Sequence, residues 1–226
     1  MTEILAKYIP NVLNNGPELI KSIKETLVMV SISGVISLVL GVLLGVILVV
    51  TKKGNILENT TINNIVDKVI NIFRSIPFII LLAALIPLTR IIVGTGIGTK
   101  GAIVPLIFGT VPFFSRQIET ALLEVDKGVI EAAQAMGSGP WEIIFRVYLR
   151  ESLPGIIRGI TITFVSLVGL SAMAGSIGGG GLGDFAIRYG YARNMIDITY
   201  VTIIIILIIV SIVQGLGNLS IKKITR

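Results

Sequence analysis

The sequence predicts an all-α integral membrane protein with five transmembrane helices, and three observations support this fold class. Of its 226 residues, 53% are hydrophobic and only 14% are charged, whereas soluble domains carry about 25% charged residues. The mean hydropathy is +0.92. Three uncharged runs exceed the roughly 20 residues that a helix needs to cross a bilayer: Leu27–Val50, Gly159–Gly183 and Ile198–Ile221.

These runs predict the first, fourth and fifth spans, at residues 27–50, 159–183 and 198–218. The region between the first and fourth spans holds only shorter uncharged runs, separated by the glycine-rich string RIIVGTGIGTKG. Spaced glycines break helices and favour turns. We therefore expect two further spans, at about 69–89 and 99–118, within a single transmembrane domain over 1–226 whose core covers about 22–217. Arg74 and Arg116 are expected to snorkel to the interface from near the span ends.

The distribution of lysine and arginine orients the five spans, because these residues collect on the cytoplasmic side. This predicts an external N-terminus and a cytoplasmic C-terminus. It also accounts for the net charge of +6 without nucleic acid as a partner. Twelve basic residues fall on the predicted cytoplasmic side: Lys52, Lys53, Lys68, Arg74, Arg116, Lys127, Arg146, Arg150, Arg158, Lys222, Lys223 and Arg226. Seven fall outside: Lys7, Lys21, Lys24, Arg90, Lys100, Arg188 and Arg193.

The composition argues against an enzyme. The chain has no cysteine and no histidine, which removes thiol nucleophiles, imidazole bases and the usual zinc and copper ligands. We expect no catalytic residues, no metal and no cofactor.

The cytoplasmic segment 119–155 resembles two short soluble helices joined by a glycine turn. Asp126 is a suitable N-cap for the first helix, Gly137 a left-handed C-cap, and Pro140 suits the first position of the second. Periodicity predicts one apolar face on each helix and a charged ridge on the second. The faces comprise Val129, Ala132, Ala133 and Met136, then Trp141, Ile144, Phe145 and Tyr148; the ridge comprises Glu142, Arg146 and Arg150.

The string EAAQAMG, Glu131–Gly137, resembles the EAA motif of ABC importer permeases. Arg150 stands where the motif has proline, although Leu153-Pro154 follows. Four further strings resemble the methionine permease family: RSIPFIILL, IVGTGIG, AIVPL and, over Leu167–Tyr191, LVGLSAMAGSIGGGGLGDFAIRYGY.

This resemblance implies the transmembrane domain of a type I ABC importer, in the bacterial inner or plasma membrane, taking up methionine. It implies a homodimer, a separate ATP-binding subunit and an extracytoplasmic substrate-binding protein. Glu131, Ala132, Ala133 and Gly137 would dock in a groove of that ATPase.

The small residues of span four, Gly169–Ser176, have two interpretations. They allow close helix packing within the subunit, or they line the dimer axis. In the second case Ser171, Met173 and Gly175 border the translocation path, with Met173 as a flexible apolar plug.

Gly178, Gly180 and Gly183 fit G-x-G-x-x-G, but nucleotide binding needs a preceding strand. We expect instead a close backbone approach near the external mouth.

Two other functions stay open: an ABC permease for another amino acid or small solute, and a stand-alone channel or secondary carrier. The absence of Asp and Glu from the predicted spans disfavours an ion-driven carrier, which usually needs such groups at depth.

Overall fold

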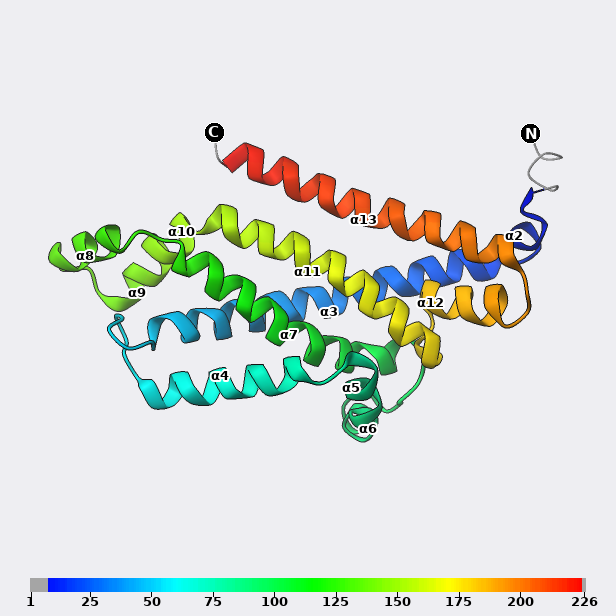
Figure 1. Cartoon of the computed structure of the whole chain (residues 1–226), viewed down its shortest axis with the longest axis horizontal. Helices are drawn as coiled ribbons and strands as arrows, with labels where there is room; N and C mark the ends of the chain where they lie inside the picture. Colours follow the sequence, from blue (N-terminus) through cyan, green and yellow to red (C-terminus); the bar gives the residue numbers. More distant parts are fainter. Residues whose placement is uncertain (1–7, 225–226) are drawn as a thin grey trace. The chain divides into compact units, whose positions relative to one another are not determined.

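Helices make up all the regular structure of residues 8–224, the part of the chain that the computed structural model describes. Figure 1 shows their order along the chain. The elements are α2 (Pro10–Asn14), α3 (Gly16–Val50), α4 (Thr60–Ser75), α5 (Phe78–Ala84), α6 (Ile86–Val93), α7 (Gly98–Leu123), α8 (Lys127–Ala135), α9 (Pro140–Glu142), the π-helix η1 (Ile143–Tyr148), α10 (Leu149–Glu151), α11 (Leu153–Ala174), η2 (Gly175–Gly179), α12 (Gly181–Phe185), η3 (Ala186–Tyr191) and α13 (Ile196–Ile224).

Four helical stretches among the described residues are long and apolar enough to cross a membrane. They are α3, α7, the run Leu153–Gly179 and α13, and they overlap the spans predicted at 27–50, 99–118, 159–183 and 198–218. Helix α3 begins well before Leu27, so Glu25 lies within it. The predicted count of five spans is not confirmed.

The predicted second span, residues 69–89, is not one helix. Helix α4 ends at Ser75, and Ile76 is extended with φ −85° and ψ 123°. Proline disfavours helical geometry in the residue before it, so Pro77 accounts for this break. A second break at Leu85 precedes α6, which carries a proline in its first turn. The region is therefore divided among α4, α5 and α6.

The predicted fourth span also ends differently. Helical geometry fails at Ile177, with φ −118°, and at Gly178, with φ +90°. The chain then turns into the short helix α12, so the stretch up to Gly183 is not one continuous helix.

One compact unit contains the described residues up to Val35, Pro77–Phe108 and Phe164–Val213. Its main core includes the fully buried side chains of Met29, Leu106 and Leu167. A smaller cluster joins Val12, Phe185 and Ile198.

The second unit contains Ile36–Ile76, Gly109–Thr163 and the described residues from Gln214 onward. Phe114 and Ile118 of α7 are fully buried at its centre. A Cβ at Gly41 or Gly45 of α3 would come within 2.5 Å of Phe114 or 2.6 Å of Ile118. Small residues thus allow α3 and α7 to approach closely, as in other membrane helix pairs.

Arg116, which was expected to snorkel to the interface, is held by three side-chain partners. Its guanidinium donates to the Asp67 carboxylate, to Asn71 Oδ1 at 2.9 Å and to Glu119 Oε2 at 2.6 Å. Its side chain is 19% exposed, so the pairing to Asp67 ties α4 to α7 within the second unit.

Candidate coupling and gating sites

The elbow between α8 and α9 is built as its local sequence predicts. Asp126 caps α8, because its carboxylate accepts a hydrogen bond from Gly128 N at 2.6 Å. Gly137 is left-handed, with φ +82°. Its N–H donates to Gln134 O at 2.9 Å and the N–H of Ser138 donates to Ala133 O at 3.0 Å. This pair of bonds is a Schellman motif, so the predicted cap and turn are confirmed.

The packed face of α8 differs from the predicted one. Ala133 is 5% exposed and packs in the core of the second unit, where Ile130 lies against the same cluster. Val129 and Met136 are instead 44% and 80% exposed, and Ala132 is exposed as well. The predicted apolar face is therefore mainly a surface face of the subunit, since only Ala133 of its four members is buried.

The second helix of the elbow is also rotated relative to the prediction. Ile143, Ile144 and Tyr148 are buried, whereas Trp141 and Phe145 are 70% and 63% exposed. A π-helix over Ile143–Tyr148 explains the error, because its i→i+5 bonding does not keep the 3.6-residue period of an α-helix.

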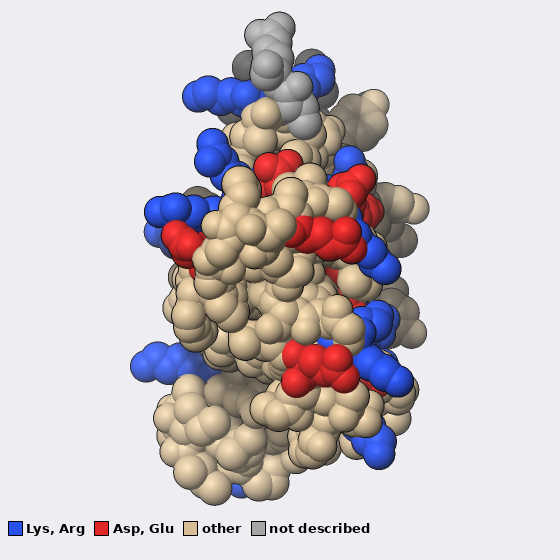
Figure 2. Space-filling model, turned by 90° about the vertical axis from the view of Figure 1, so that its left-hand side faces the viewer, with Lys and Arg blue, Asp and Glu red and all other residues tan. Residues whose placement is uncertain are grey.

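The exposed side of this helix still carries part of the predicted charged ridge. Arg146 pairs with Glu142 at 3.2 Å, and the rings of Trp141 and Phe145 stack with centroids 6.3 Å apart. Figure 2 views the end of the structure that carries α8 and α9, and shows a broad uncharged area with acidic and basic side chains beside it.

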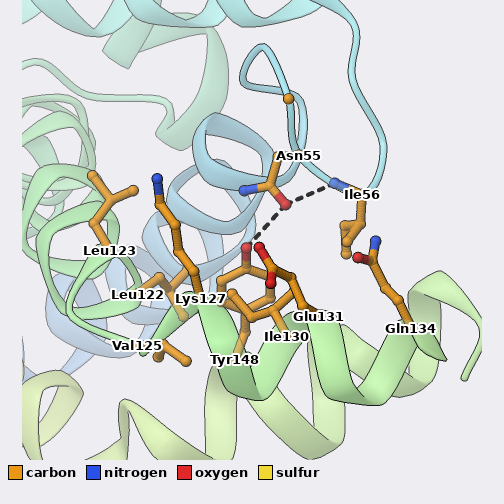
Figure 3. Close-up of a pocket in the computed structure, with 11 residues that line it drawn as sticks. Asn55, Ile56, Leu122, Leu123, Val125, Lys127, Ile130, Glu131, Gln134 and Tyr148 are labelled. Atoms are coloured by element: carbon orange, nitrogen blue, oxygen red, sulfur yellow. Dashed lines mark hydrogen bonds between the residues drawn. The ribbon is translucent and has the colours of Figure 1, made fainter. Parts of the chain in front are cut away.

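A pocket of about 280 Å³ lies between α8, the π-helix and the loop that follows α3. The Tyr148 hydroxyl donates to Asn55 Oδ1 at 2.9 Å, and Ile56 N donates to the same oxygen at 2.7 Å (Figure 3). Burial raises the pKa of the Tyr148 phenol, and the hydrogen bond to Asn55 offsets part of that rise. Glu131 and Gln134 of α8 line the same pocket.

Asn55 was missed at the sequence level. It is 93 residues from Tyr148, and no local pattern signals a contact between segments so far apart.

The four predicted docking residues of the EAA string thus fall into two groups. Glu131, Ala132 and Gly137 are exposed, and Glu131 also borders the pocket. Ala133 faces the core of its own unit.

The three predicted path residues of α11 and η2 divide in the same way. Ser171 is buried and its hydroxyl donates to Val168 O at 2.7 Å. Gly175 is buried against α12, where an added Cβ would lie 2.6 Å from Asp184 N. Met173 is 43% exposed. Of the two interpretations of this stretch, internal packing therefore fits Ser171 and Gly175, while Met173 is left partly exposed within the subunit.

The glycine-rich string after Met173 makes the close backbone approach that the sequence predicts. A Cβ on Gly183 would lie only 2.1 Å from the carbonyl oxygen of Ala172. Gly178 and Gly180 have φ of +90° and +77°. No strand precedes them among the described residues, and no group of three acidic side chains in that part of the chain could hold a metal.

The family described as "Binding-protein-dependent transport system inner membrane component" matches residues 37–226. The chain belongs to this family. The probable D-methionine transport system permease protein MetI of Vibrio cholerae is 50% identical over 210 residues, 93% of each chain. The methionine import system permease protein MetP of Bacillus subtilis is 47% identical over 213 residues, 94% of this chain and 95% of the relative.

Solved structures agree with this assignment. A structure of the inward-facing MetNI methionine ABC transporter superposes with a TM-score of 0.92 at 44% identity, and the match covers 94% of this chain and 99% of that one. An amino acid ABC transporter with histidines shares the fold, with a TM-score of 0.78 at 16% identity over 95% and 98% of the two chains. The predictions of an ABC importer transmembrane fold, of a permease component rather than an enzyme and of a multi-pass inner membrane protein are confirmed.

Proposed function

We propose that this permease imports methionine as a homodimer, joined to a separate ATP-binding subunit and supplied by an extracytoplasmic substrate-binding protein. The observation that carries the proposal is the 47–50% identity, over more than nine-tenths of the chain, to permeases named for methionine transport.

Reconstitution into proteoliposomes tests this proposal. The permease would be purified in mild detergent with its co-purifying ATPase and supplied with its binding protein. ATP-dependent uptake of labelled methionine is expected, with competition by unlabelled methionine and none by histidine or glutamate. Uptake of another amino acid in preference to methionine would contradict the substrate assignment and leave the family assignment intact.

The exposed side of α8 supports a docking role for the elbow. Ala132 offers a small side chain and Gly137 a fixed turn, while Glu131 offers a charge at the pocket rim. Small exposed residues allow a partner to approach the helix closely. Ala133 supports the proposed docking surface indirectly, because it packs in the core and so holds α8 in place. The ATPase would therefore push on a helix that is fixed to its own unit.

Met173 is our candidate for the gate residue, with Ser171 and Gly175 shaping the helix behind it. A symmetric homodimer relates equivalent residues by a two-fold axis. The two exposed Met173 side chains can therefore meet at this axis.

Met173→Ala is expected to increase passive methionine leak while changing stability by less than about 0.5 kcal/mol, as exposed substitutions usually do. The reason is that the side chain is 43% exposed within its subunit. Leak from ATP-free proteoliposomes and thermal melts of the same preparation measure the two effects. Met173→Leu, which keeps the bulk, is the control. A large fall in melting temperature with unchanged leak would contradict the gate assignment.

The proposed orientation has the N-terminus outside and the C-terminus in the cytoplasm. The charge split between the two sides supports it; of the residues counted, Lys7 and Arg226 lie outside the described part of the chain.

Because the chain has no cysteine, single cysteines report the orientation cleanly. We expect a membrane-impermeant thiol reagent to label Tyr8→Cys in intact cells, and Lys223→Cys only after permeabilisation. Both positions are exposed in the structure. Labelling of both in intact cells would exclude the proposed topology.

A further inference from the structure

Two side chains of α3 hold the glycine-rich turn that follows α11. Glu25 Oε2 accepts a hydrogen bond from Gly181 N at 2.7 Å, and Thr26 Oγ1 accepts one from Leu182 N at 2.8 Å. Each bond joins residues 156 positions apart. Thr26 is 3% exposed, and the bond to Leu182 is buried.

These bonds satisfy backbone groups that α12 cannot satisfy itself. The first N–H groups of a helix lack partners within the helix, and the N-cap of α12 is Gly180, which has no side chain to accept them. A carboxylate is also favourable beside such N–H groups. Glu25 and Thr26 therefore serve as a cap supplied from another helix.

Glycine occupies both positions in the turn because Gly180 and Gly181 have φ of +77° and +76°, a conformation that disfavours side chains, and the close fit adds to this preference. A Cβ on Gly180 would lie 2.7 Å from Glu25 Oε2, and one on Gly181 would lie 2.7 Å from Thr26 Oγ1. We name the contacts of Glu25 and Thr26 with Gly180–Leu182 the α3 clamp.

The α3 clamp is connected to the residues around Met173 by backbone packing. Gly183 lies against the carbonyl of Ala172, and Gly175 lies against Asp184 N. Ala172 and Gly175 flank Met173 on both sides, and the Ser176 hydroxyl donates to Met173 O at 2.7 Å. Whatever fixes α12 therefore also fixes the end of α11 that carries Met173.

We propose that Glu25 and Thr26 are positioning residues for the gate: their two hydrogen bonds hold the glycine-rich turn, and with it the end of α11 that carries Met173, in the position that the structure shows. This inference rests on the proposed gate. It also gives a role to the Glu25 carboxylate. The predicted first span begins at Leu27 and therefore did not include Glu25.

A buried cysteine reporter tests the α3 clamp. Ala174 is fully buried beside Met173, and Ala121 is 4% exposed in the second unit. Ala174→Cys and Ala121→Cys would be labelled separately with a thiol reagent in nanodiscs, where both membrane faces are accessible. Labelling of a buried thiol measures local opening.

The variants separate shape from hydrogen bonding. Thr26→Val keeps the shape and loses the acceptor, whereas Thr26→Ser keeps the hydroxyl. Glu25→Ala loses the carboxylate and Glu25→Gln keeps one carbonyl oxygen. Glu18→Ala is the matched control, because Glu18 lies on the same helix and pairs with Lys21 instead.

We expect Thr26→Val and Glu25→Ala to raise labelling at Ala174→Cys about tenfold, which corresponds to about 1.4 kcal/mol. Thr26→Ser, Glu25→Gln and Glu18→Ala should stay within about threefold of the parent, and labelling at Ala121→Cys should not change. Passive methionine leak should rise with labelling at Ala174→Cys.

Equal labelling of Ala174→Cys in all variants would overturn the proposal, as would a parallel rise at Ala121→Cys, which indicates general unfolding. A rise at Ala174→Cys without leak would refute the connection to the gate. Wild-type methionine uptake, measured in parallel, reports on the proposed function alone, because the labelling does not depend on the transported solute.

Discussion

Gly183→Ala is expected to destabilise the permease by about 3 kcal/mol, the upper part of the usual range for overpacking. The added Cβ would lie 2.1 Å from Ala172 O and 2.7 Å from both the carbonyl carbon and the Cα of Ala172. All three are backbone atoms, so no side-chain rotation relieves the clash. Either α12 or the end of α11 must move.

Thermal melts in detergent measure this loss, and Gly215→Ala is the matched control. Gly215 lies in α13, is exposed, and would have no atom within 4 Å of an added Cβ. Alanine is favoured over glycine within a helix, so this control should melt at or slightly above the wild-type temperature. Equal melting temperatures for Gly183→Ala and Gly215→Ala would contradict the packing of α12 on α11.

Gly137→Val is expected to lower ATP-driven uptake about tenfold while membrane insertion stays normal. A side chain is penalised by about 1–2 kcal/mol in the left-handed region, and a branched one is especially unfavourable there. A cost of 1–2 kcal/mol changes a conformational population by a factor of about 5–30. No atom lies within 4 Å of an added Cβ, so the effect arises from backbone strain rather than from a clash.

Gly139→Val separates this strain from the mere addition of a side chain. Gly139 has φ −72° and ψ 161°, which suits any residue, and it also has open space around its Cβ position. Uptake per inserted molecule should therefore remain close to wild type in Gly139→Val. If both valine variants transport equally well, the left-handed turn at Gly137 is not a coupling element.

The local features of the elbow were predictable from sequence because each depends on few residues. Asp126 caps the helix that directly follows it. Gly137 takes the left-handed conformation, which residues with a side chain rarely adopt. The long apolar helices were predictable for a similar reason, since hydrocarbon thickness sets the length of an uncharged run.

The buried faces of the elbow were not predictable in this way. Periodicity reports which side of a helix is apolar, but Val129 and Met136 are apolar and exposed. The π-helix changed the face after Glu142, so that Ile143 rather than Trp141 is buried. An apolar side chain that contacts a partner protein has the same sequence pattern as one that packs in the core.

Contacts between segments that are distant in the sequence were also not predicted. The bonds from Gly181 to Glu25 and from Tyr148 to Asn55 join residues 156 and 93 positions apart. Each requires the fold to exist before either partner acquires its role. Glu25 in particular had the pattern of an ordinary charged residue before an apolar run.

The stack of Trp141 on Phe145 gives the permease an optical reporter of its own. Trp141 is the single tryptophan in the chain, it is 70% exposed, and it lies on the elbow proposed to meet the ATPase. Indole emission shifts to shorter wavelength when water around the ring is replaced by protein. When the permease is excited at a wavelength that its five tyrosines do not absorb, its own emission therefore originates from this elbow, and assembly can be followed there in real time without attaching a dye.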